Sequence, residues 1–318
     1  MLKEKIIVTN LKKHFWISKK DFVHAVDGVS FNIFEGETMG LVGESGCGKT
    51  TVGRCVLRLI EPDEGKIIFK DKNILDFSKK EMKRFRKEVQ IIFQDPFSSL
   101  DPRKTVEKLI SEPLRINKFG NKKQIKKRVL DLLSKVYLNQ EIINKYPHEL
   151  DGGRCQRIGL ARAISLNPSF LVCDEPVSAL DVSSQAQVLK LIEEFREKLG
   201  LTYLFISHNL SVIRKLSQRI MVMYLGLIVE MADANELFNE PLHPYTKALL
   251  SAVPTLDVNN CRKRIILKGD VPTPINIGEG CRFYKRCYKS LKKCAYISPA
   301  LVEISKNHFV RCHLYNEE

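Results

Sequence analysis

The sequence lacks an apolar run long enough to cross a membrane: the longest, Met221 to Val229, is far shorter than the roughly 18 residues that a spanning helix needs. Residues Met1 to Lys5 lack the apolar core of a signal peptide, so we expect the chain to stay in the cytoplasm. Internal repeats and low-complexity linkers are also missing. The 318 residues are 44% hydrophobic and 28% charged, which excludes a disordered chain, a collagen and a small disulfide scaffold and predicts about two domains.

Acidic residues are outnumbered, because 52 Lys and Arg stand against 37 Asp and Glu and give a formal net charge of +15. The stretch from Arg115 to Arg128 holds seven basic residues and no acidic one. Such an excess indicates a polyanionic partner (nucleic acid, an anionic membrane surface or nucleotide phosphates), although solvated helix faces explain it equally well. The stretch has a single aromatic residue, Phe119, and lacks the series of interleaved aromatic residues on which successive bases stack, so we do not expect nucleic acid as a partner.

The nine cysteines are unevenly distributed. Four are scattered over the first half, whereas five crowd the C-terminal part: Cys261, Cys281, Cys287, Cys294 and Cys312. Disulfides are rare in cytosolic proteins. The C-terminal crowding therefore indicates a group that binds a ligand.

Hydrophobic periodicity predicts alternating strands and helices. Strands are expected at Val29–Ile33, Met39–Val42, Phe170–Cys173 and Tyr203–Ile206, with a hairpin over Ile220–Val229 that turns near Gly226. Helices are expected where apolar residues recur every three or four positions: Val52, Cys55, Val56 and Ile60; Ile125, Val129, Leu132, Leu133 and Val136; Val188, Leu191, Ile192 and Phe195; Leu210, Ile213 and Leu216. This alternation predicts an α/β fold with a mainly parallel sheet. The periodicity fades past Pro254, and we place a domain boundary near residue 256.

A phosphate-binding motif follows the predicted strand Met39–Val42. The pattern G-x-x-x-x-G-K-[ST] matches Gly43, Glu44, Ser45, Gly46, Cys47, Gly48, Lys49 and Thr50. A predicted helix follows the loop, and Thr51, the next residue, is also a candidate nucleotide-binding residue. In such a loop the backbone N–H groups surround the phosphates, the lysine adds a positive charge, and the hydroxyl of Thr50 is placed to bind Mg²⁺. The sequence therefore predicts a nucleotide site.

Two carboxylates end the predicted strand Phe170–Cys173. Asp174 stands at the carboxyl end of the strand, where it is placed to hold Mg²⁺. Glu175 comes next and is placed to act as the general base toward an attacking water. Adjacent acids at a strand end are a weak signal alone, and the phosphate loop makes it a strong one.

The chain resembles the nucleotide-binding subunits of ABC transporters over nearly its whole length. The segment Tyr146–Arg157, which includes Asp151, Gly152 and Gly153, is similar to the family's signature. The resemblance implies a sensor of Mg²⁺ at Gln94, a dimer-facing loop at Asp181, a switch histidine at His208, and an aromatic residue that stacks on adenine at Phe15, with Trp16 as the substitute. It also implies a parallel core sheet, an antiparallel β subdomain, and a helical subdomain inserted over about residues 95–163.

Within that family the chain is most similar to oligopeptide and dipeptide import ATPases. The segments Glu44–Gly48, Leu57–Pro62 and Pro241–Thr246 carry this likeness, and Ser99–Arg103 favours the F-type member of the D/F pair. The resemblance implies residues 1–255 as the ATP-binding domain and 256–318 as the C-terminal region of peptide transporters. It also implies a D-type ATPase partner, two membrane permeases, an extracytoplasmic peptide-binding protein, and a peripheral place on the cytoplasmic face of the membrane. Importers of nickel and glutathione share these motifs and stay open as alternatives.

The sequence departs from the family pattern in the signature. Asp151 stands where Ser is usual, Arg154 where Gln is usual, and Asn209 follows His208 where Asp is commoner. A carboxylate at position 151 would face the γ-phosphate of ATP on the partner, unless it is protonated or paired with Arg154. This keeps open a regulatory subunit that binds ATP without turnover. A soluble ABC ATPase that acts on nucleic acid is the other rival, and it lacks the tandem cassettes or inserted domain that this would need.

Four C-terminal cysteines form the last candidate site. Cys281, Cys287, Cys294 and Cys312 are separated by 5, 6 and 17 residues. Structural zinc sites use cysteine pairs only two to four residues apart, and a 4Fe–4S cluster needs wider spacing. The resemblance implies such a cluster in a structural role, with zinc or four reduced thiols as alternatives. Basic neighbours are expected to offset its negative charge: Arg282, Lys285, Arg286, Lys292, Lys293 and Arg311. Cys261 is expected to take no part.

Overall fold

The computed structural model describes residues 3–253, 263–270 and 272–315. The expected boundary between residues 255 and 256 lies outside these ranges, and so does Cys261. The chain forms two compact units. Unit 1 consists of the residues up to Lys5, Phe34–Glu37 and Asp76–Phe205, and unit 2 consists of Ile6–Ile33, Thr38–Leu75 and the chain from Ile206 onward. Each unit is described separately.

The strands of unit 1 place an acidic pair at a strand end. Strand β6 (Val89–Ile92) runs parallel to β7 (Phe170–Asp174), with Val89 opposite Phe170. Strand β8 (Thr202–Ile206) lies on the other side of β7. Every residue of β7 and β8 is buried, as their unbroken apolar runs predict.

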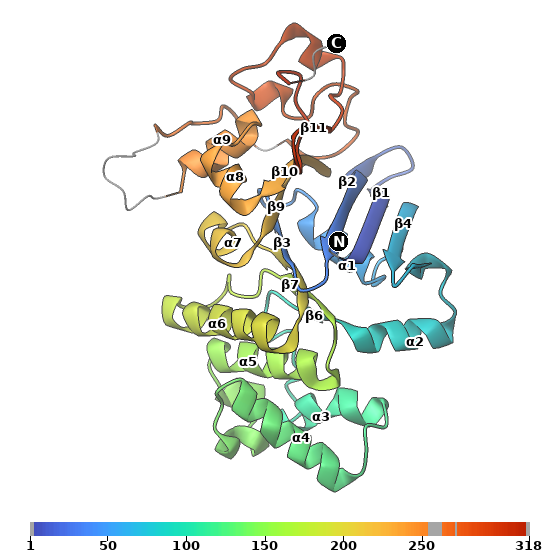
Figure 1. Cartoon of the computed structure of the whole chain (residues 1–318), viewed down its shortest axis with the longest axis vertical. Coiled ribbons are helices and arrows are strands. Elements are labelled where there is room, and N and C mark those ends of the chain that lie inside the picture. Colours follow the sequence, from blue (N-terminus) through green and yellow to red (C-terminus); the bar gives the residue numbers. More distant parts are fainter. Residues whose placement is uncertain (1–2, 254–262, 271, 316–318) are drawn as a thin grey trace. The chain divides into compact units, whose positions relative to one another are not determined.

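The helices of unit 1 are α2 (Lys79–Glu88), α3 (Val106–Ile116), α4 (Lys122–Lys135), α5 (Gly152–Ala163) and α6 (Val182–Leu199). Short 3₁₀ turns lie at Gln140–Asn144, Pro147–Glu149 and Ile164–Leu166. Helices α3, α4 and α5 pack against one another (green in Figure 1), and Leu109, Val129 and Ile158 are almost fully buried between them. The periodic residues Ile125 to Leu133 form the inner face of α4, as expected.

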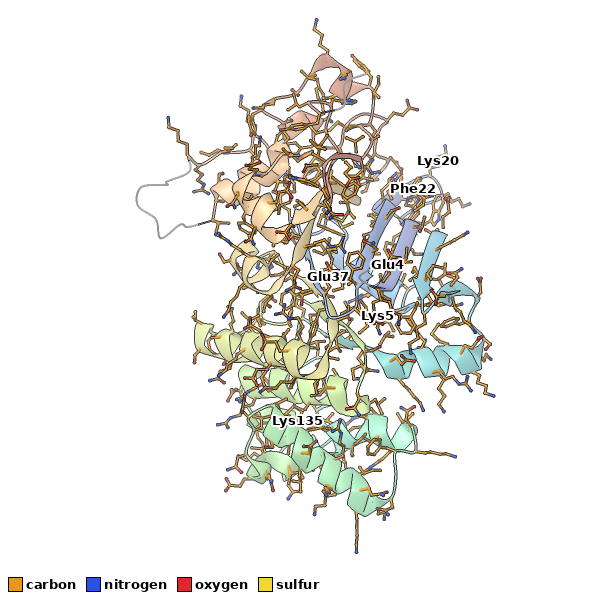
Figure 2. The ribbon with its side chains drawn as sticks, in the orientation of Figure 1. Glu4, Lys5, Lys20, Phe22, Glu37 and Lys135 are labelled. Atoms are coloured by element: carbon orange, nitrogen blue, oxygen red, sulfur yellow. The ribbon has the colours of Figure 1, made fainter. Side chains whose placement is uncertain are left out.

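The basic stretch Arg115–Arg128 lies at the end of α3 and over the first half of α4. Six of its basic side chains are exposed to solvent: Arg115, Lys118, Lys122, Lys123, Lys126 and Lys127. Arg128 pairs with Asp131 at 2.9 Å, and Lys135 at the end of the same helix pairs with Asp131 at 3.2 Å (Figure 2). This arrangement is that of a solvated helix face opposite an apolar one.

Unit 2 contains an antiparallel sheet in the order β2-β1-β4-β5. Its strands are β1 (Glu4–Trp16, with Glu4 and Lys5 counted in unit 1), β2 (Phe22–Phe34), β4 (Glu64–Phe69) and β5 (Lys72–Asn73). Ile6 pairs with Phe69, and the register shifts once between Thr9 and Lys12. Phe22 opens β2 next to the turn that carries Lys20 (Figure 2). The expected strand Val29–Ile33 is the second half of β2.

The other sheet strands of unit 2 place the phosphate loop. Strand β3 (Thr38–Val42) runs parallel to β9 (Arg219–Tyr224), with Met39 opposite Arg219. Strand β10 (Leu227–Asp233) forms the expected hairpin with β9 around Gly226. Two C-terminal strands, β12 (His308–Val310) and β11 (Val302–Ser305), then add to β10 in antiparallel fashion. The expected parallel strands therefore continue into an antiparallel end, because the C-terminal strands, which the sequence pattern does not predict, extend the hairpin.

The helices of unit 2 are α1 (Lys49–Val56), α7 (Leu210–Leu216), α8 (Ala234–Asn239) and α9 (Pro244–Ser251). The 3₁₀ turns are Ile74–Asp76, at the junction of the units, and Tyr284–Arg286 and Lys292–Ala295 in the cysteine region. Helix α1 ends before Ile60, contrary to expectation, because the chain turns into the left-handed region at Arg58 (φ 49°).

Candidate active site

Glycines give the phosphate loop its shape. Gly48 caps α1 with φ of 109°, a conformation that residues with a side chain rarely adopt. A Cβ atom added there would lie 1.9 Å from the backbone oxygen of Ala25, so the space is closed as well. Gly46 also has positive φ (78°), but its surroundings are open. The loop therefore depends on glycine in two ways, through dihedral angle at both positions and through close packing at Gly48.

Lys49 is the buried cation of the loop. Its Nζ donates to the backbone oxygens of Gly43 at 2.8 Å and Glu44 at 2.9 Å, and lies 3.8 Å from Sγ of Cys47. Only 5% of Lys49 is exposed. The amine is thus held inside the loop that the motif predicts, with Thr50 and Thr51 next on the helix and half-buried.

Glu44 is held by two residues that the motif does not include. Its backbone N–H donates to the hydroxyl of Tyr245 at 2.9 Å. Its carboxylate accepts hydrogen bonds from both terminal nitrogens of Arg286, at 2.7 and 3.1 Å. In the sequence, the segment that contains Tyr245 stands out only as a family likeness, and Arg286 is predicted to lie beside the cysteines. No local pattern in the sequence reveals a contact between residues 242 positions apart.

The aromatic candidates Phe15 and Trp16 end strand β1 and are exposed. Lys13 lies over the ring of Phe15, with its Nζ 5.6 Å from the ring centre. Trp16 packs against Phe22 with ring centres 5.0 Å apart and ring planes tilted by 49°. An exposed ring at a strand end is available to a flat ligand, and Phe15 and Trp16 both meet this condition.

A compact ionisable group lies next to these aromatic residues. His14 Nε2 is 3.5 Å from one oxygen of Asp27, and His24 Nδ1 is 3.0 Å from the other. Burial raises the pKa of Asp27, but the guanidinium of Arg282 and the ring of His24 outweigh it and hold that pKa below its usual value. Within the described ranges this is the one His, Cys, Asp or Glu group close enough to hold a single metal ion. Arg282 already pairs with the carboxylate and neutralises it.

His208 belongs to unit 2 and lies two residues after the end of β8, with its side chain exposed. The next residue, Asn209, caps α7 through its side-chain oxygen, which accepts from Ser211 at 3.0 Å and Val212 at 3.4 Å. Asn is as good a helix cap as Asp, which explains why the helix tolerates this departure from the family pattern.

Unit 1 brings together the two acids and the glutamine. Asp174 ends β7 and is 4% exposed. Gln94 lies two residues beyond the end of β6 and donates through Nε2 to Glu175 Oε2 at 3.2 Å. Glu175 adopts φ of 48°, which costs about 1–3 kcal/mol for a residue with a side chain. A strained carboxylate that is oriented by an amide is typical of a functional position.

The signature segment forms the start of α5, and Asp151 is its cap. Asp151 Oδ1 accepts from the backbone N–H of Arg154 at 2.7 Å, and Oδ2 lies 3.3 Å from Arg154 Nε. Of the two alternatives, protonation of Asp151 or pairing with Arg154, the structure contains the pairing. Gly153 lets α5 approach α6 closely, since a Cβ atom there would lie 2.5 Å from Ser184 Oγ. Gln156 ties the same helix to the backbone oxygen of Phe93, next to Gln94.

Asp181 caps α6 by accepting from the backbone N–H of Ser184 at 3.0 Å. Hydrogen bonds from Ser184 lower the pKa of this carboxyl, so it is ionised at neutral pH. Its side chain is exposed. Asp181 and the signature residues therefore present charged and polar groups to solvent from two helix starts of unit 1.

The four C-terminal cysteines are unbridged, and each sulfur has a backbone N–H directed at it. In Cys281, Cys287 and Cys312 the donor is the residue two positions further on. Cys294 accepts from the N–H of Leu291 at 3.4 Å. Such N–H groups stabilise thiolates. In Cys281, Cys287 and Cys312 burial outweighs these N–H groups and raises the pKa of the thiol, to about 11 in Cys281.

The basic neighbours of the cysteines are only partly placed as expected. Arg282 pairs with Asp27, and Arg286 pairs with Glu44. Arg311 donates to the backbone oxygens of Ile228 and Pro299, both at 3.1 Å. The expectation that the arginines offset the charge of a cysteine-bound cluster is therefore wrong for Arg282 and Arg286, whose charges are paired with carboxylates elsewhere in unit 2. The charge of Arg311 has no acidic partner among these contacts and acts on Cys281.

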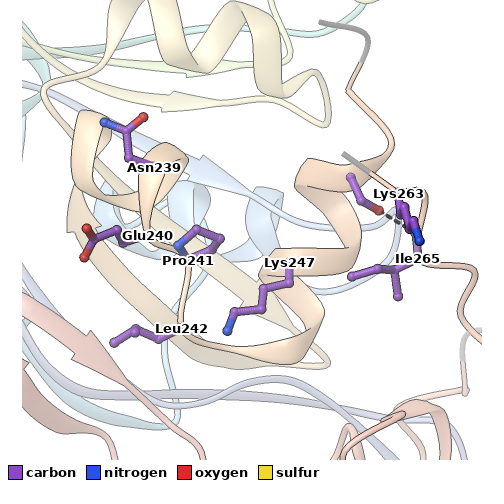
Figure 3. A pocket seen from close by; sticks show the side chains of 8 residues that line it. Asn239, Glu240, Pro241, Leu242, Lys247, Lys263 and Ile265 are labelled. Carbon is purple, nitrogen blue, oxygen red and sulfur yellow. Dashed lines mark hydrogen bonds between the residues drawn. The ribbon is translucent and has the colours of Figure 1, made fainter. Parts of the chain in front are cut away.

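An open hollow of about 570 Å³ lies beside α9 (Figure 3). Pro241, Leu242 and Ile265 supply apolar surface, and Lys247 and Lys263 supply charge. The backbone N–H of Ile265 donates to Ser251 Oγ at 2.9 Å along its wall. No residue predicted for ATP chemistry lines it, so it is not part of the candidate active site.

No helix in the described part of the chain is long and apolar enough to cross a membrane. Two families match the chain: "ABC transporter" over residues 26–178 and "Oligopeptide/dipeptide transporter, C-terminal region" over residues 229–294. Among solved structures, the ATP-binding cassette MJ0796, a dimer bound to ADP and Pi, has a TM-score of 0.66 and 27% identity and covers 72% of this chain and 98% of that one.

Curated relatives extend over nearly the full length. The chain is 50% identical to a putative oligopeptide transport ATP-binding protein of Bacillus subtilis, YkfD, over 97% of this chain and 94% of the relative. It is 48% identical to AppF, an oligopeptide transport ATP-binding protein of the same organism, over 96% of each. It is 45% identical to OppF of Haemophilus influenzae over 94% and 91%. The loop around Lys49, the acids after β7 and these likenesses agree: the chain belongs to the ABC transporter family, among its oligopeptide transport ATP-binding proteins.

Proposed function

We propose that this chain is the ATP-hydrolysing subunit that energises the import of oligopeptides or dipeptides through a membrane ABC transporter. The observation that carries the proposal is the buried Lys49 in a glycine-shaped loop at the start of α1, which is a ready site for nucleotide phosphates. The full-length likeness to peptide transporters supports the substrate class. Nickel and glutathione remain the alternative cargoes.

The residues of the loop bind and orient ATP. The backbone N–H groups of Gly43–Gly48 and the amine of Lys49 stabilise the charge of the β- and γ-phosphates. The Thr50 hydroxyl, the Gln94 amide oxygen and the Asp174 carboxylate are the proposed Mg²⁺ ligands, and oxygen donors of this kind are those that Mg²⁺ prefers. Mg²⁺ supplies electrostatic stabilisation of the transferred phosphoryl group when bound. Phe15 or Trp16 stacks on adenine.

Glu175 is the proposed general base. It accepts a proton from a water, whose oxygen forms a bond to the γ-phosphorus while the bond to the ADP oxygen breaks, leaving ADP and phosphate. Gln94 holds the Glu175 carboxylate by the hydrogen bond of 3.2 Å. His208 contacts the γ-phosphate as the switch residue.

A second ATPase subunit of D type completes the proposed machine. ATP on that partner faces Asp151, Gly152, Gly153 and Asp181 of this chain, and ATP on this chain faces the partner's signature. Closure of the two subunits on ATP drives two membrane permeases, which an extracytoplasmic peptide-binding protein supplies with cargo. The chain then lies peripherally on the cytoplasmic face of the membrane, and no nucleic acid takes part.

We divide the chain functionally into residues 1–255, the ATP-binding domain with its helical subdomain over about 95–163, and residues 256–318, the C-terminal region. For that region we propose a 4Fe–4S cluster on Cys281, Cys287, Cys294 and Cys312. The N–H groups directed at all four sulfurs suit metal-bound thiolates. A single zinc would need sulfurs within about 4.6 Å of one another, twice the Zn–S bond. No three of these four described cysteines meet a limit of 4.8 Å.

The cluster proposal has a direct test. Anaerobic purification should give a brown protein that absorbs near 400 nm with about four irons per chain, and Cys287→Ser should bleach it. A colourless anaerobic preparation with stoichiometric zinc would show that the metal is wrong. A colourless preparation without metal would show that the four thiols are only reduced structural cysteines.

The function itself is tested on the native assembly. Subunits that co-purify with the full chain are reconstituted in vesicles, and ATP hydrolysis is measured together with uptake of labelled peptide, Ni²⁺ and glutathione. We expect ATP-dependent uptake of peptide that Lys49→Ala abolishes. ATP binding without turnover in every assembly would instead favour the regulatory subunit, and uptake of Ni²⁺ or glutathione alone would reassign the cargo.

A further inference from the structure

The side chain of Arg286 connects the cysteine-bearing segment to the phosphate loop. This residue ends the 3₁₀ turn Tyr284–Arg286 and directly precedes Cys287. Its two terminal nitrogens meet the two carboxylate oxygens of Glu44 at 2.7 and 3.1 Å, a bidentate pair within unit 2. Its side chain is 8% exposed and that of Glu44 is 23% exposed, so water screens the pair only weakly.

Glu44 is an unfavourable charge for its position. It is the second residue of a loop whose proposed ligand is the polyphosphate of ATP, and a carboxylate beside phosphates repels them. A bidentate guanidinium cancels that charge and fixes the side chain at the same time. The loop keeps an acidic residue without an electrostatic penalty only while Arg286 is present.

The backbone of Glu44 is also part of the machinery. Its carbonyl accepts from Lys49 Nζ at 2.9 Å, and its N–H donates to Tyr245 at 2.9 Å. A displacement of Glu44 therefore displaces an acceptor of the lysine that is proposed to bind the phosphates. Arg286 thus acts on Lys49 indirectly, through Glu44.

Aromatic packing makes the arginine a fixed anchor. Phe283, three residues earlier in the same turn, packs edge-on against Tyr224 with ring centres 5.2 Å apart, and against Tyr245 at 5.5 Å. Tyr224 also offers its hydroxyl to Arg286 at 3.5 Å. Phe283, Tyr224 and Tyr245 are almost fully buried, so the turn is held rigidly.

We propose that Arg286 is a positioning residue of the ATP site: its ion pair with Glu44 neutralises and orients the phosphate loop, and so makes ATP affinity depend on the C-terminal cysteine segment. This inference rests on the proposed function only in taking the loop around Lys49 as the ATP site. It concerns an arginine outside the motif and needs no metal on the cysteines.

The test is titration of the full-length chain with a fluorescent ATP analogue. We expect Arg286→Ala to raise its Kd about tenfold, and Arg286→Lys, which keeps the charge but loses the bidentate geometry, to raise it less. Lys285→Ala is the matched control, because it removes the same charge from the exposed neighbouring residue. Equal Kd values for Arg286→Ala and Lys285→Ala would overturn the proposal.

A second background separates positioning from general damage. In Glu44→Gln there is no charge to neutralise, so adding Arg286→Ala should change the Kd less than about twofold. A tenfold loss of affinity for the ATP analogue in both backgrounds would show that Arg286 acts through folding alone and would overturn the proposal. The unfolding midpoint of each variant is recorded by circular dichroism. A wild-type chain that binds no ATP would refute the proposed function instead, and Lys49→Ala marks that baseline.

Discussion

The phosphate loop and the signature segment are both proposed to meet ATP, yet they are built in opposite ways. The loop is a backbone structure: Gly48 has no room for a side chain, and Lys49 is buried. The signature begins with exposed side chains, since 60% of the Asp151 side chain and 47% of that of Arg154 face solvent. The loop keeps the family pattern at every position, whereas the signature departs from it twice.

The difference shows which kind of departure a fold tolerates. Replacing Ser by Asp at the start of α5 preserves the local structure, because both side chains cap a helix equally well. The cap hydrogen bond of 2.7 Å to Arg154 is present. A departure at Gly48 has no such substitute. A substitution at Gly48 in the loop therefore disturbs the backbone structure, whereas the substitution at position 151 in the signature changes only the charge presented there.

The largest expected effect comes from Gly48→Ala, which tests the structural half of this comparison. The added Cβ atom would lie 1.9 Å from the backbone oxygen of Ala25. We expect this clash to cost about 4 kcal/mol, either as a lower free energy of unfolding or as an ATP affinity about 10³-fold lower. Calorimetric titration with ATP and thermal unfolding measure the two quantities. Gly46→Ala is the control, because it has positive φ without a clash and should cost about 1 kcal/mol.

The next effect is on catalysis. Glu175→Gln should keep ATP binding and lower turnover by about 10²-fold or more, because a positioned general base contributes that much. The assembled transporter should then hold ATP in a closed dimer. Steady-state hydrolysis and retention of labelled ATP check the two statements, and near-native turnover would show that Glu175 is not the base.

A pH effect is expected in the side chains that support the loop. His243 caps α9 by accepting from the N–H of Tyr245, and burial lowers the pKa of His243 to about 4. The unfolded chain therefore takes up this proton at higher pH than the folded one does. The stabilisation is complete above about pH 6.5 and is lost as the pH falls toward about 4, by about 3 kcal/mol.

Denaturant unfolding of the wild type and of His243→Asn checks this sign. Asn caps a helix without titrating. The wild type should lose about 3 kcal/mol more than the variant between pH 6.5 and 4, and parallel curves would refute the assignment.

The smallest effect tests the chemical half of the comparison. Asp151→Ser should raise turnover at the partner's ATP site about threefold, a modest change because Arg154 already pairs with the carboxylate and solvent screens both. Asp151→Asn removes the charge, keeps the cap and should act alike. Single-turnover hydrolysis, measured with the partner's own base intact and Glu175→Gln in this chain, isolates that site even when the dimer stays closed afterwards. An unchanged rate would mean that the carboxylate does not face the phosphate.

Local signals in the sequence predict local features of the molecule well. The apolar run before Asp174 predicts β7, and the glycine spacing predicts the loop between β3 and α1. Helix α4 appears where the residues from Ile125 to Leu133 recur at helical spacing. In each case the cause lies within a few residues of the effect, which is why a pattern reveals it.

Contacts between residues far apart in the sequence cannot be predicted from such local patterns. Arg286 is one of several basic residues near the cysteines, and only the fold gives it Glu44 as a partner. Strands β11 and β12 are short and follow a stretch without periodicity, so the sequence does not reveal that β12 pairs with β10 and β11 with β12. Helix α1 ends early because of a dihedral angle at Arg58 that hydrophobic spacing does not encode.

Unit 2 is built from segments that lie far apart in the sequence, and this has a consequence for its folding during biosynthesis. Strand β3 pairs with β9, so Met39 has no strand partner until Arg219 has been translated. Glu44 likewise has no ion-pair partner until Arg286 has been translated. The residues between Asp76 and Phe205 form unit 1 and are complete much earlier. During translation the body of unit 1 can therefore fold first, while the nucleotide loop stays unfinished until the last part of the chain emerges from the ribosome.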